Sequence, residues 1–515
     1  MISKALVKTH FNKAKTNNML MIKMLQCWRK LADFFLHTFG FIILRDLAKT
    51  LSSFHAIHER LTKTLKEHNG TLLFRGPWFI GLKFVVTSDH NNVNYILNKN
   101  FANYGKGDGF KEIFEFLGNG IFNSDGESWR FQKKQIHSLF KDARFVLARD
   151  RITRRKISQG LFLILDDAVA SGAEVDAQDL FRRFMFDTSC MLLLDHDPNG
   201  LSIGLPNVAC EEAFTVMEKI IFKRHIVPSV VWKLLRRLDI GEEKKARRAV
   251  ALFDNFLHDC ILAKKNENRK KHETADGIDL VSFFTAEKEE DTEDEAARAI
   301  KRSDKFLRDT VFNLMAAGRD AVSAGLTWFL WVVATHPAIE EKIMEEMRRM
   351  CGDGANKERK IFEEREVDEM IYLNATVLET LRLYPPIPFE HKCSREADVL
   401  PSGQKIPKNG RVIYSLYAMG RMESIWGEDC LEFKPERWIT EDGKIKHVPL
   451  YKFIAFNAGQ RTCMGKHLSL FQIKTVVSAL LWNYRFEIDH GSPVALCGSI
   501  VLDMKHGLPI KVFKR

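Results

Sequence analysis

FNAGQRTCMG, residues 456–465, is the one stretch of this 515-residue chain in which a cysteine lies within a recognisable sequence motif. The segment reads F-x-x-G-x-R-x-C-x-G, with Cys463 at its eighth position. The next residues, KHLSLFQIKTVVSALLW (466–482), have the pattern of a helix whose N-terminal dipole would favour a thiolate. A thiolate, rather than a thiol, binds iron and donates electron density to it. The pattern therefore predicts that Cys463 is the axial ligand of a haem iron.

The other fixed positions of the motif also have chemical reasons. Gly459 and Gly465 would let the backbone approach the sulfur and a porphyrin, in turns that other residues rarely adopt. Arg461 can form a charge-assisted hydrogen bond with a haem propionate, and Phe456 can shield the sulfur from water. Five matched positions in ten residues favour a haem-thiolate site over an inert cysteine.

Two further motifs lie upstream in the order that such a site requires. Glu379-Thr380-Leu381-Arg382 reads E-x-x-R on a predicted helix, and the i, i+3 spacing places both ionisable side chains on one face. PERW, residues 435–438, supplies Arg437. With these motifs the chain, from about residue 55 to its end, resembles the cytochrome P450 superfamily. The resemblance implies a structural cluster of Glu379, Arg382 and Arg437 beside the haem.

Within that superfamily the chain is similar to the plant branch that hydroxylates long-chain fatty acids and alkanes, and more narrowly to its mid-chain alkane hydroxylases of cuticular wax synthesis. The stretches that carry this similarity are LFRGPWF (73–79), NSDGESW (123–129), AGRD (317–320), LYPPIPFEHK (383–392) and DMKHGL (503–508). The resemblance implies haem b as cofactor, an NADPH-dependent flavoprotein reductase as partner and a hydrophobic small-molecule substrate. It also implies the cytosolic face of the endoplasmic reticulum membrane as the location.

Helical periodicity dominates the chain. Apolar residues recur at three- and four-residue spacing in 181–194, 248–263 and 367–384, whereas strand-like alternation is confined to 71–88 and 411–416. The longest predicted helix runs from about 305 to 335 and ends before Pro337. We predict a mainly α protein with a small β-rich subdomain, the cytochrome P450 fold, in which the haem is buried between this central helix and the cysteine loop.

Two positions depart from the pattern of the resembled family. The family places a threonine after the acid of the central helix to relay protons, but here Ala321 follows Asp320. Ser323 is no substitute, because two further residues rotate a helical side chain by about 200°. We therefore predict that proton delivery depends on Asp320 with water, or on a substrate hydroxyl. The family's W-x-x-x-R clamp for a haem propionate is Trp129 with Lys133, which keeps the charge but loses the bidentate fork.

Two regions of unequal size are expected. Residues 1–50 form a basic, partly apolar N-terminal segment, and residues 51–515 form a single catalytic domain. The segment has seven basic and no acidic residues up to position 32, and its apolar stretch at 31–44 is shorter than the roughly 20 residues that span a bilayer. Contact with a membrane surface is therefore predicted. The signal anchor and proline-rich hinge of the family are not recognisable there.

Composition narrows the classes of partner. The formal charge of +11 suits anionic lipid or an acidic reductase, and no zinc-finger or RNP-type motif points to nucleic acid. Nine cysteines without CxxC spacing argue against a disulfide framework or a structural zinc site.

Three functions stay open at this point. The first is hydroxylation of a long-chain alkane or fatty acid. The second is oxidative phenol coupling by a cytochrome P450 of alkaloid metabolism, which inserts no oxygen and would tolerate Ala321. The third is haem binding with little turnover. Candidate substrate-contacting residues are Phe110, Phe114 and Phe116 in the expected access loop, with Ile387, Phe389 and Val501 as pocket lining.

Overall fold

Helices make up most of the structure, a computed structural model that describes residues 57–75, 83–268, 278–286, 300–352, 359–488 and 494–515. Residues His58–Arg515 form one unit, and the fold is described for this unit. The helices are α3 (Ile57–Glu67), α4 (His90–Asn94), α5 (Asp108–Ile113), α6 (Gly126–Lys141), α7 (Ala143–Lys156), α8 (Phe162–Ser171), α9 (Ala177–Leu194), α10 (Ala209–Ile226), α11 (Ser229–Leu238), α12 (Gly241–Asn268), α13 (Leu280–Thr285), α15 (Asp304–Thr335), α16 (Pro337–Cys351), α17 (Glu364–Glu369), α18 (Ile371–Leu383), α19 (Leu416–Met419), α20 (Glu423–Trp426) and α21 (Lys466–Asn483). The N-terminal segment 1–50 and its predicted membrane contact lie outside the described residues.

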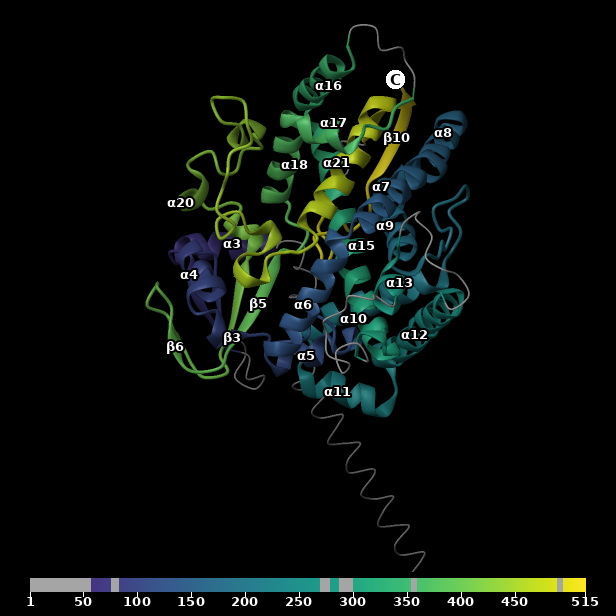
Figure 1. Ribbon diagram of the computed structural model, residues 1–515. Helices are drawn as coiled ribbons and strands as arrows, with labels where there is room; N and C mark the ends of the chain where they lie inside the picture. Colours follow the sequence, from purple (N-terminus) through teal and green to yellow (C-terminus); the bar gives the residue numbers. More distant parts are fainter. Residues whose placement is uncertain (1–56, 76–82, 269–277, 287–299, 353–358, 489–493) are drawn as a thin grey trace, which may run out of the picture. The chain divides into compact units, whose positions relative to one another are not determined.

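The long helix α15 confirms the predicted central helix. The Ser303 side chain caps it by accepting the N–H of Phe306, and it ends at Thr335, two residues before Pro337 begins α16. It packs against α9, α18 and α21 (Figure 1). In the described parts of the chain no single helix is long and apolar enough to cross a membrane. Taken together, α15 and α16 have the length and composition of a membrane span, but a bend of 105° separates them.

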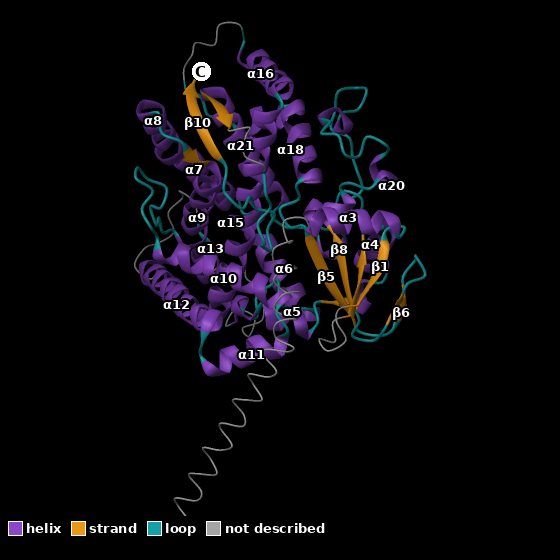
Figure 2. Ribbon diagram, turned by 180° about the vertical axis from the view of Figure 1, so that it is seen from behind, coloured by secondary structure: helices purple, strands orange, loops and turns teal. Residues whose placement is uncertain are grey.

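A small sheet lies to one side of the helices, as Figure 2 shows. Its strand order is β1 (Thr71–Arg75), β2 (Lys83–Thr87), β8 (Arg411–Ser415), β5 (Phe389–Ser394) and β3 (Tyr104–Gly105), and only the β2–β8 pair among them is parallel. A second sheet orders β4 (Val175–Asp176), β10 (Pro509–Lys514) and β9 (Tyr484–Ile488), and β6 (Asp398–Val399) pairs with β7 (Lys405–Ile406). The prediction of a mainly α protein with a small β-rich part is confirmed.

Two large hydrophobic clusters meet on α15. One joins it to α9, α18 and α21, and the other joins it to α10 and α12. Phe456, next to the cysteine loop, belongs to the first cluster together with Val322 and Leu326 of α15. The core therefore fixes the cysteine loop and the central helix as parts of one packed body.

Candidate functional site

The cysteine loop connects two short 3₁₀ turns to α21. The turns are η9 (Ile454–Phe456) and η10 (Gly459–Arg461), and the N–H of Cys463 donates to the carbonyl of Phe456 at 2.8 Å. The Cys463 side chain is exposed, yet burial by surrounding protein raises the pKa of its thiol, against the opposing effects of the Gly465 N–H and Lys466. The sulfur is thus enclosed on some sides and open on another. An iron placed on the open side would deprotonate the thiol outright.

The two glycines of the motif have different roles. Gly459 adopts φ +64°, and a Cβ there would lie 2.1 Å from the carbonyl oxygen of Leu97. Gly465 has φ −83°, which any residue adopts, and a Cβ there would approach nothing closer than Cys463 Sγ at 3.8 Å. The expectation of a turn closed to other residues therefore applies to Gly459 and is wrong for Gly465.

Gly459→Ala is expected to lower the free energy of unfolding by about 3 kcal/mol or more. The strain energy of a side chain at positive φ, about 1–3 kcal/mol, adds to the clash of the new Cβ with the Leu97 carbonyl. Gly443→Ala is the matched control, since φ is +73° there and nothing lies within 4 Å of the added Cβ. It should cost about 1–2 kcal/mol. Urea unfolding monitored by circular dichroism compares the two. Equal losses would mean that the contact with Leu97 relaxes without cost.

Arg461 of the cysteine motif and Lys133 of the propionate clamp lie beside one indole ring, that of Trp129. Arg461 donates to Asp125 and to the Ser124 carbonyl, both at 2.8 Å, and its guanidinium lies 4.2 Å from the centre of the buried Trp129 ring. Lys133 Nζ lies 5.1 Å from the same ring centre and donates to the Gln460 carbonyl at 2.7 Å. The structure thus brings together the three residues predicted to face the propionates. Arg461 Nε is buried and has no hydrogen-bond partner among the described residues.

Two buried lysines, from β5 and from the loop after β3, extend this basic group. Burial, and then the charge of Lys106, lower the pKa of Lys392 to about 7, although Glu390 opposes the shift. Burial also lowers the pKa of Lys106, whose Nζ lies 3.8 Å from Glu390. Arg461 and Asp125 contribute to both shifts, so these groups share one electrostatic environment.

This set of groups fits a haem. The buried Lys106 and Lys392 and the half-buried Arg461 share their surroundings with two carboxylates, and further anionic charge would satisfy the orphaned Arg461 Nε. Haem supplies two propionates, and the open thiol of Cys463 supplies the axial ligand that the iron needs. Lys106 was not predicted, because nothing in the local sequence GKGDG marks it.

The E-x-x-R pair and PERW meet in the core. Arg382 Nε and Nη2 donate to the two carboxylate oxygens of Glu379 at 2.7 and 2.8 Å, and Arg437 Nε lies 3.4 Å from the same carboxylate. Trp438 Nε1 and the Lys434 N–H also donate to Glu379, at 2.8 and 2.9 Å. Arg382 bonds the carbonyls of Gly420, Cys430 and Glu432 as well. The cluster joins α18 to the segment that leads into the cysteine loop.

The acid of the central helix has partners that the sequence did not reveal. Arg319 Nη1 donates to Asp320 at 2.9 Å, and Arg319 Nη2 donates to Thr215 of α10 at 2.7 Å. Burial first, and then the charge of Glu218, raise the pKa of Asp320 to about 8. Ser323 Oγ donates back to the Asp320 carbonyl at 3.1 Å, so its hydroxyl is engaged with its own helix.

The candidate substrate residues divide into separate groups. Phe110 stacks on Phe114 with ring centres 4.3 Å apart, and their rings lie beside His391 and His225. Phe116 instead lies under the Arg224 guanidinium, 4.3 Å from ring centre to charge, and Phe389 stacks on His58. Ile387 is half-buried and Val501 is buried in the loop before β10. The structure brings Phe110 and Phe114 together but turns Phe116 and Phe389 toward other partners.

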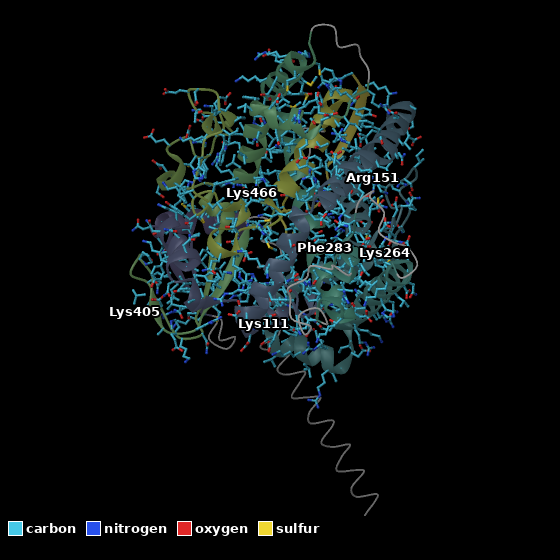
Figure 3. All side chains as sticks on the ribbon, in the orientation of Figure 1. Lys111, Arg151, Lys264, Phe283, Lys405 and Lys466 are labelled. Carbon is cyan, nitrogen blue, oxygen red and sulfur yellow. The ribbon has the colours of Figure 1, made fainter. Side chains whose placement is uncertain are left out.

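The basic residues Arg461, Lys466 and Lys474, which follow one another around Cys463 and could contact an acidic reductase, differ in exposure. Arg461 faces inward, and Lys474 is buried in an ion pair with Asp368. Lys466, labelled in Figure 3, is half-buried at the start of α21, 5.6 Å from the centre of the Phe456 ring. Lys474 therefore lacks the exposed charge that reductase contact would require.

Comparison with known proteins agrees with this geometry. The family model for cytochrome P450 matches residues 47–498. Alkane hydroxylase MAH1 from Arabidopsis thaliana is 38% identical over 474 residues, which cover 92% of each chain. Cytochrome P450 86B1 from the same plant is 38% identical over 89% of this chain and 82% of its own length. Noroxomaritidine synthase 1 from Narcissus pseudonarcissus is 38% identical over 88% of this chain and 87% of its own. The chain thus belongs to the cytochrome P450 family, whose members use haem b and electrons from NADPH delivered by a reductase.

Proposed function

We propose that this monooxygenase hydroxylates a long-chain aliphatic substrate, an alkane or a fatty acid. The reaction consumes the substrate R–H, O₂, NADPH and one proton, and it yields R–OH, water and NADP⁺. The observation that carries the proposal is the open, protein-enclosed thiol of Cys463 in a loop joined through the core to the central helix. The similarity to an alkane hydroxylase over 92% of both chains supports the substrate class.

In the proposed reaction the residues of the site have separate roles in binding the haem and in holding a proton. Cys463 holds the haem iron, and the bound haem supplies the oxygen-activating chemistry. Arg461, Lys133 and Trp129 hold the propionate side, and the buried Lys106 and Lys392 add positive charge there. Phe456 keeps water from the sulfur, and Gly459 permits the tight turn before it. Asp320 holds a proton on the substrate side, where Ala321 offers no hydroxyl.

Phe110 and Phe114 give the substrate site an aromatic wall, and the loop with Val501 gives it an aliphatic one. Apolar surfaces of this kind suit an alkyl chain, which gains about 0.8 kcal/mol per buried methylene group.

A substrate panel tests the proposal. The purified protein, with a plant reductase and NADPH, receives a long-chain alkane, a long-chain fatty acid or a phenolic amine, and mass spectrometry identifies the products. Hydroxylated alkane or fatty acid supports aliphatic hydroxylation. A coupled phenol as the sole product would replace it with the second candidate. No product from any substrate, with haem bound, would favour the third.

Oxidative phenol coupling is the alternative because two observations suit it. Ala321 removes the hydroxyl that relays protons when oxygen is inserted, and coupling inserts none. Noroxomaritidine synthase 1 has the same 38% identity to this chain as the alkane hydroxylase, over 88% of the chain against 92%.

We further propose that the protein contacts the cytosolic face of the endoplasmic reticulum membrane through α11. Its exposed apolar side chains Val230, Leu234 and Leu238 recur every four residues, and Lys233 and Arg236 accompany them. Trp232 on the opposite face is buried against Arg224. An exposed apolar stripe with basic neighbours is typical of a helix that lies in an anionic lipid surface.

Leu234→Asp is expected to weaken binding of the full chain to phosphatidylserine-containing vesicles by about 10- to 150-fold, because it removes about 1.5–3 kcal/mol of apolar burial. Leu147→Asp is the matched control, since Leu147 is a single exposed leucine on α7, 64% exposed against 54% for Leu234. Vesicle co-sedimentation measures both. Equal binding of the two variants would argue that α11 stays in water.

A further inference from the structure

Five charged side chains from four parts of the chain meet beside the middle of α15. Arg319 Nη1, which bonds Asp320, also lies 3.9 Å from Glu218 of α10. Arg182 of α9 pairs with Asp503, in the loop before β10, at 2.6 Å. Four of the five are buried, whereas Arg182 is 24% exposed and gives the cluster its contact with solvent. We call this group the Asp320 cluster.

Carboxylates outnumber cations in the Asp320 cluster. It contains three carboxylates, Asp320, Glu218 and Asp503, and two guanidinium groups, Arg319 and Arg182. A fourth carboxylate, that of Glu211 in α10, lies 3.7 Å from Arg319. Burial first, and then the charge of Asp503, raise the pKa of the nearby Cys497 thiol. Buried carboxylates in excess of their cations cannot all ionise, so the cluster retains a proton.

The position of that proton follows from the contacts. Glu218 accepts from Ser499 Oγ at 2.6 Å and Asp503 accepts from Arg182 at 2.6 Å, so each of these carboxylates has a donor of its own. Within the described part of the chain, Asp320 accepts a side-chain hydrogen bond from Arg319 Nη1 on Oδ1, so the geometry assigns the proton to Oδ2. Burial first, and then neighbouring acids, raise the pKa of Asp320 to about 8 and that of Asp503 to about 6, so Asp320 keeps its proton to the higher pH.

Resting on the proposed function, we propose that Glu218 and Asp503 are positioning residues that keep a proton on Asp320 at neutral pH. Each turnover takes protons from solvent, and with Ala321 no hydroxyl follows the acid to relay them. Asp320 would release the proton from Oδ2 toward the oxygen atom that leaves as product water, and it would regain one from solvent at the Arg182 end, so the cluster returns to its starting state. The two acids act through Asp320 and need not touch the substrate.

The cluster also fixes the loop that carries Val501. Ser499 and Asp503 flank this residue, and both are held by the cluster, through Glu218 and Arg182. The Leu502 carbonyl between them accepts from Trp328 Nε1 of α15 at 2.5 Å. The same contacts therefore hold a candidate substrate-lining residue and set the charge around Asp320.

Infrared titration of the haem-loaded protein tests the proposal without turnover. The C=O band of a protonated carboxylic acid should disappear in Asp320→Asn. In Glu218→Gln and in Asp503→Asn, its titration midpoint should move to lower pH by at least about one unit, because a repelling negative charge is lost. Asp309→Asn is the matched control: the same substitution in the same helix, at an acid paired with Arg308 outside the cluster, should leave the midpoint unchanged.

The pH dependence of unfolding gives a second readout. A carboxyl whose pKa rises from its ordinary 3.8 to about 8 binds a proton in the folded protein that the unfolded chain has released. Its contribution to stability is present below about pH 4 and is lost as pH rises toward 8. Asp320→Asn should remove this decrease of stability with rising pH, and in Glu218→Gln the decrease should end at a lower pH. A merely structural role of Glu218 would lower stability equally at every pH.

The product formed per NADPH completes the test. It should fall as pH rises through the midpoint of Asp320, and Glu218→Gln should move that fall to lower pH. An unshifted carboxyl midpoint in both acid-to-amide variants would overturn the proposal even if hydroxylation is normal. A shifted midpoint without alkane or fatty-acid product would instead overturn the proposed function and leave the role of the two acids standing.

Discussion

Cys463→Ser is expected to reduce product formation by well over 100-fold and to remove the red shift of the ferrous–CO Soret band. Changes to groups that merely orient a metal ligand already cost about 10–100-fold, so loss of the ligand should exceed that range. A serine hydroxyl neither ionises near neutral pH nor donates electron density as a thiolate does. The surroundings should survive, because the loop is held by the Cys463 N–H, the Phe456 packing and the Lys133–Gln460 bond.

Cys351→Ser is the matched control for this substitution. Cys351 ends α16, is half-buried and has Lys360 Nζ 3.5 Å from its sulfur, so its replacement should leave the spectrum and turnover unchanged. Spectra of the reduced, CO-bound proteins compare the two variants. A red-shifted band in Cys463→Ser would show that another residue ligates the iron.

Glu379→Gln is expected to lower the free energy of unfolding by about 3–5 kcal/mol. The carboxylate is fully buried and accepts from Arg382, Trp438 and the Lys434 N–H. An amide cannot balance the buried Arg382 charge and replaces one acceptor oxygen with a donor. Removing one partner of a buried ion pair is costly in this range because the other charge stays in the core.

Glu436→Gln supplies the control one residue from Arg437. Glu436 is 44% exposed and pairs with Lys342 at the surface, so the same change should cost less than about 1 kcal/mol. Equilibrium unfolding in urea measures both. A difference below about 1 kcal/mol between them would contradict the structural role of the Glu379 cluster.

Short-range patterns predicted much of the fold and site. The run 305–335 ends at a proline, and the helix is Asp304–Thr335, because a proline stops a helix wherever the rest of the chain lies. Glu379 and Arg382 share a helix face through their spacing, and the structure joins them with Arg437. Their distance along the chain did not prevent the prediction, because both motifs occur in the order that the resembled family shows.

Contacts between distant segments were not predictable in this way. Lys106 and Lys392 come from a loop and a strand almost 300 positions apart, and their shared environment arises where the β3–β5 pairing aligns them. The partners of Asp320 come from α9, α10 and the loop before β10, which no local pattern connects. Phe116 was predicted to face substrate, and the guanidinium of Arg224, 108 positions away, lies over its ring, a contact that no local pattern indicates.

Labelling with ¹⁸O₂ tests the central claim most directly. The haem-loaded protein, a reductase and NADPH act on a long-chain alkane or fatty acid under ¹⁸O₂, and mass spectrometry measures the label in the alcohol. We expect one ¹⁸O atom in each alcohol molecule and about one alcohol for each NADPH consumed. NADPH consumption that yields peroxide or water, with no labelled alcohol from either substrate, would contradict aliphatic hydroxylation by this protein.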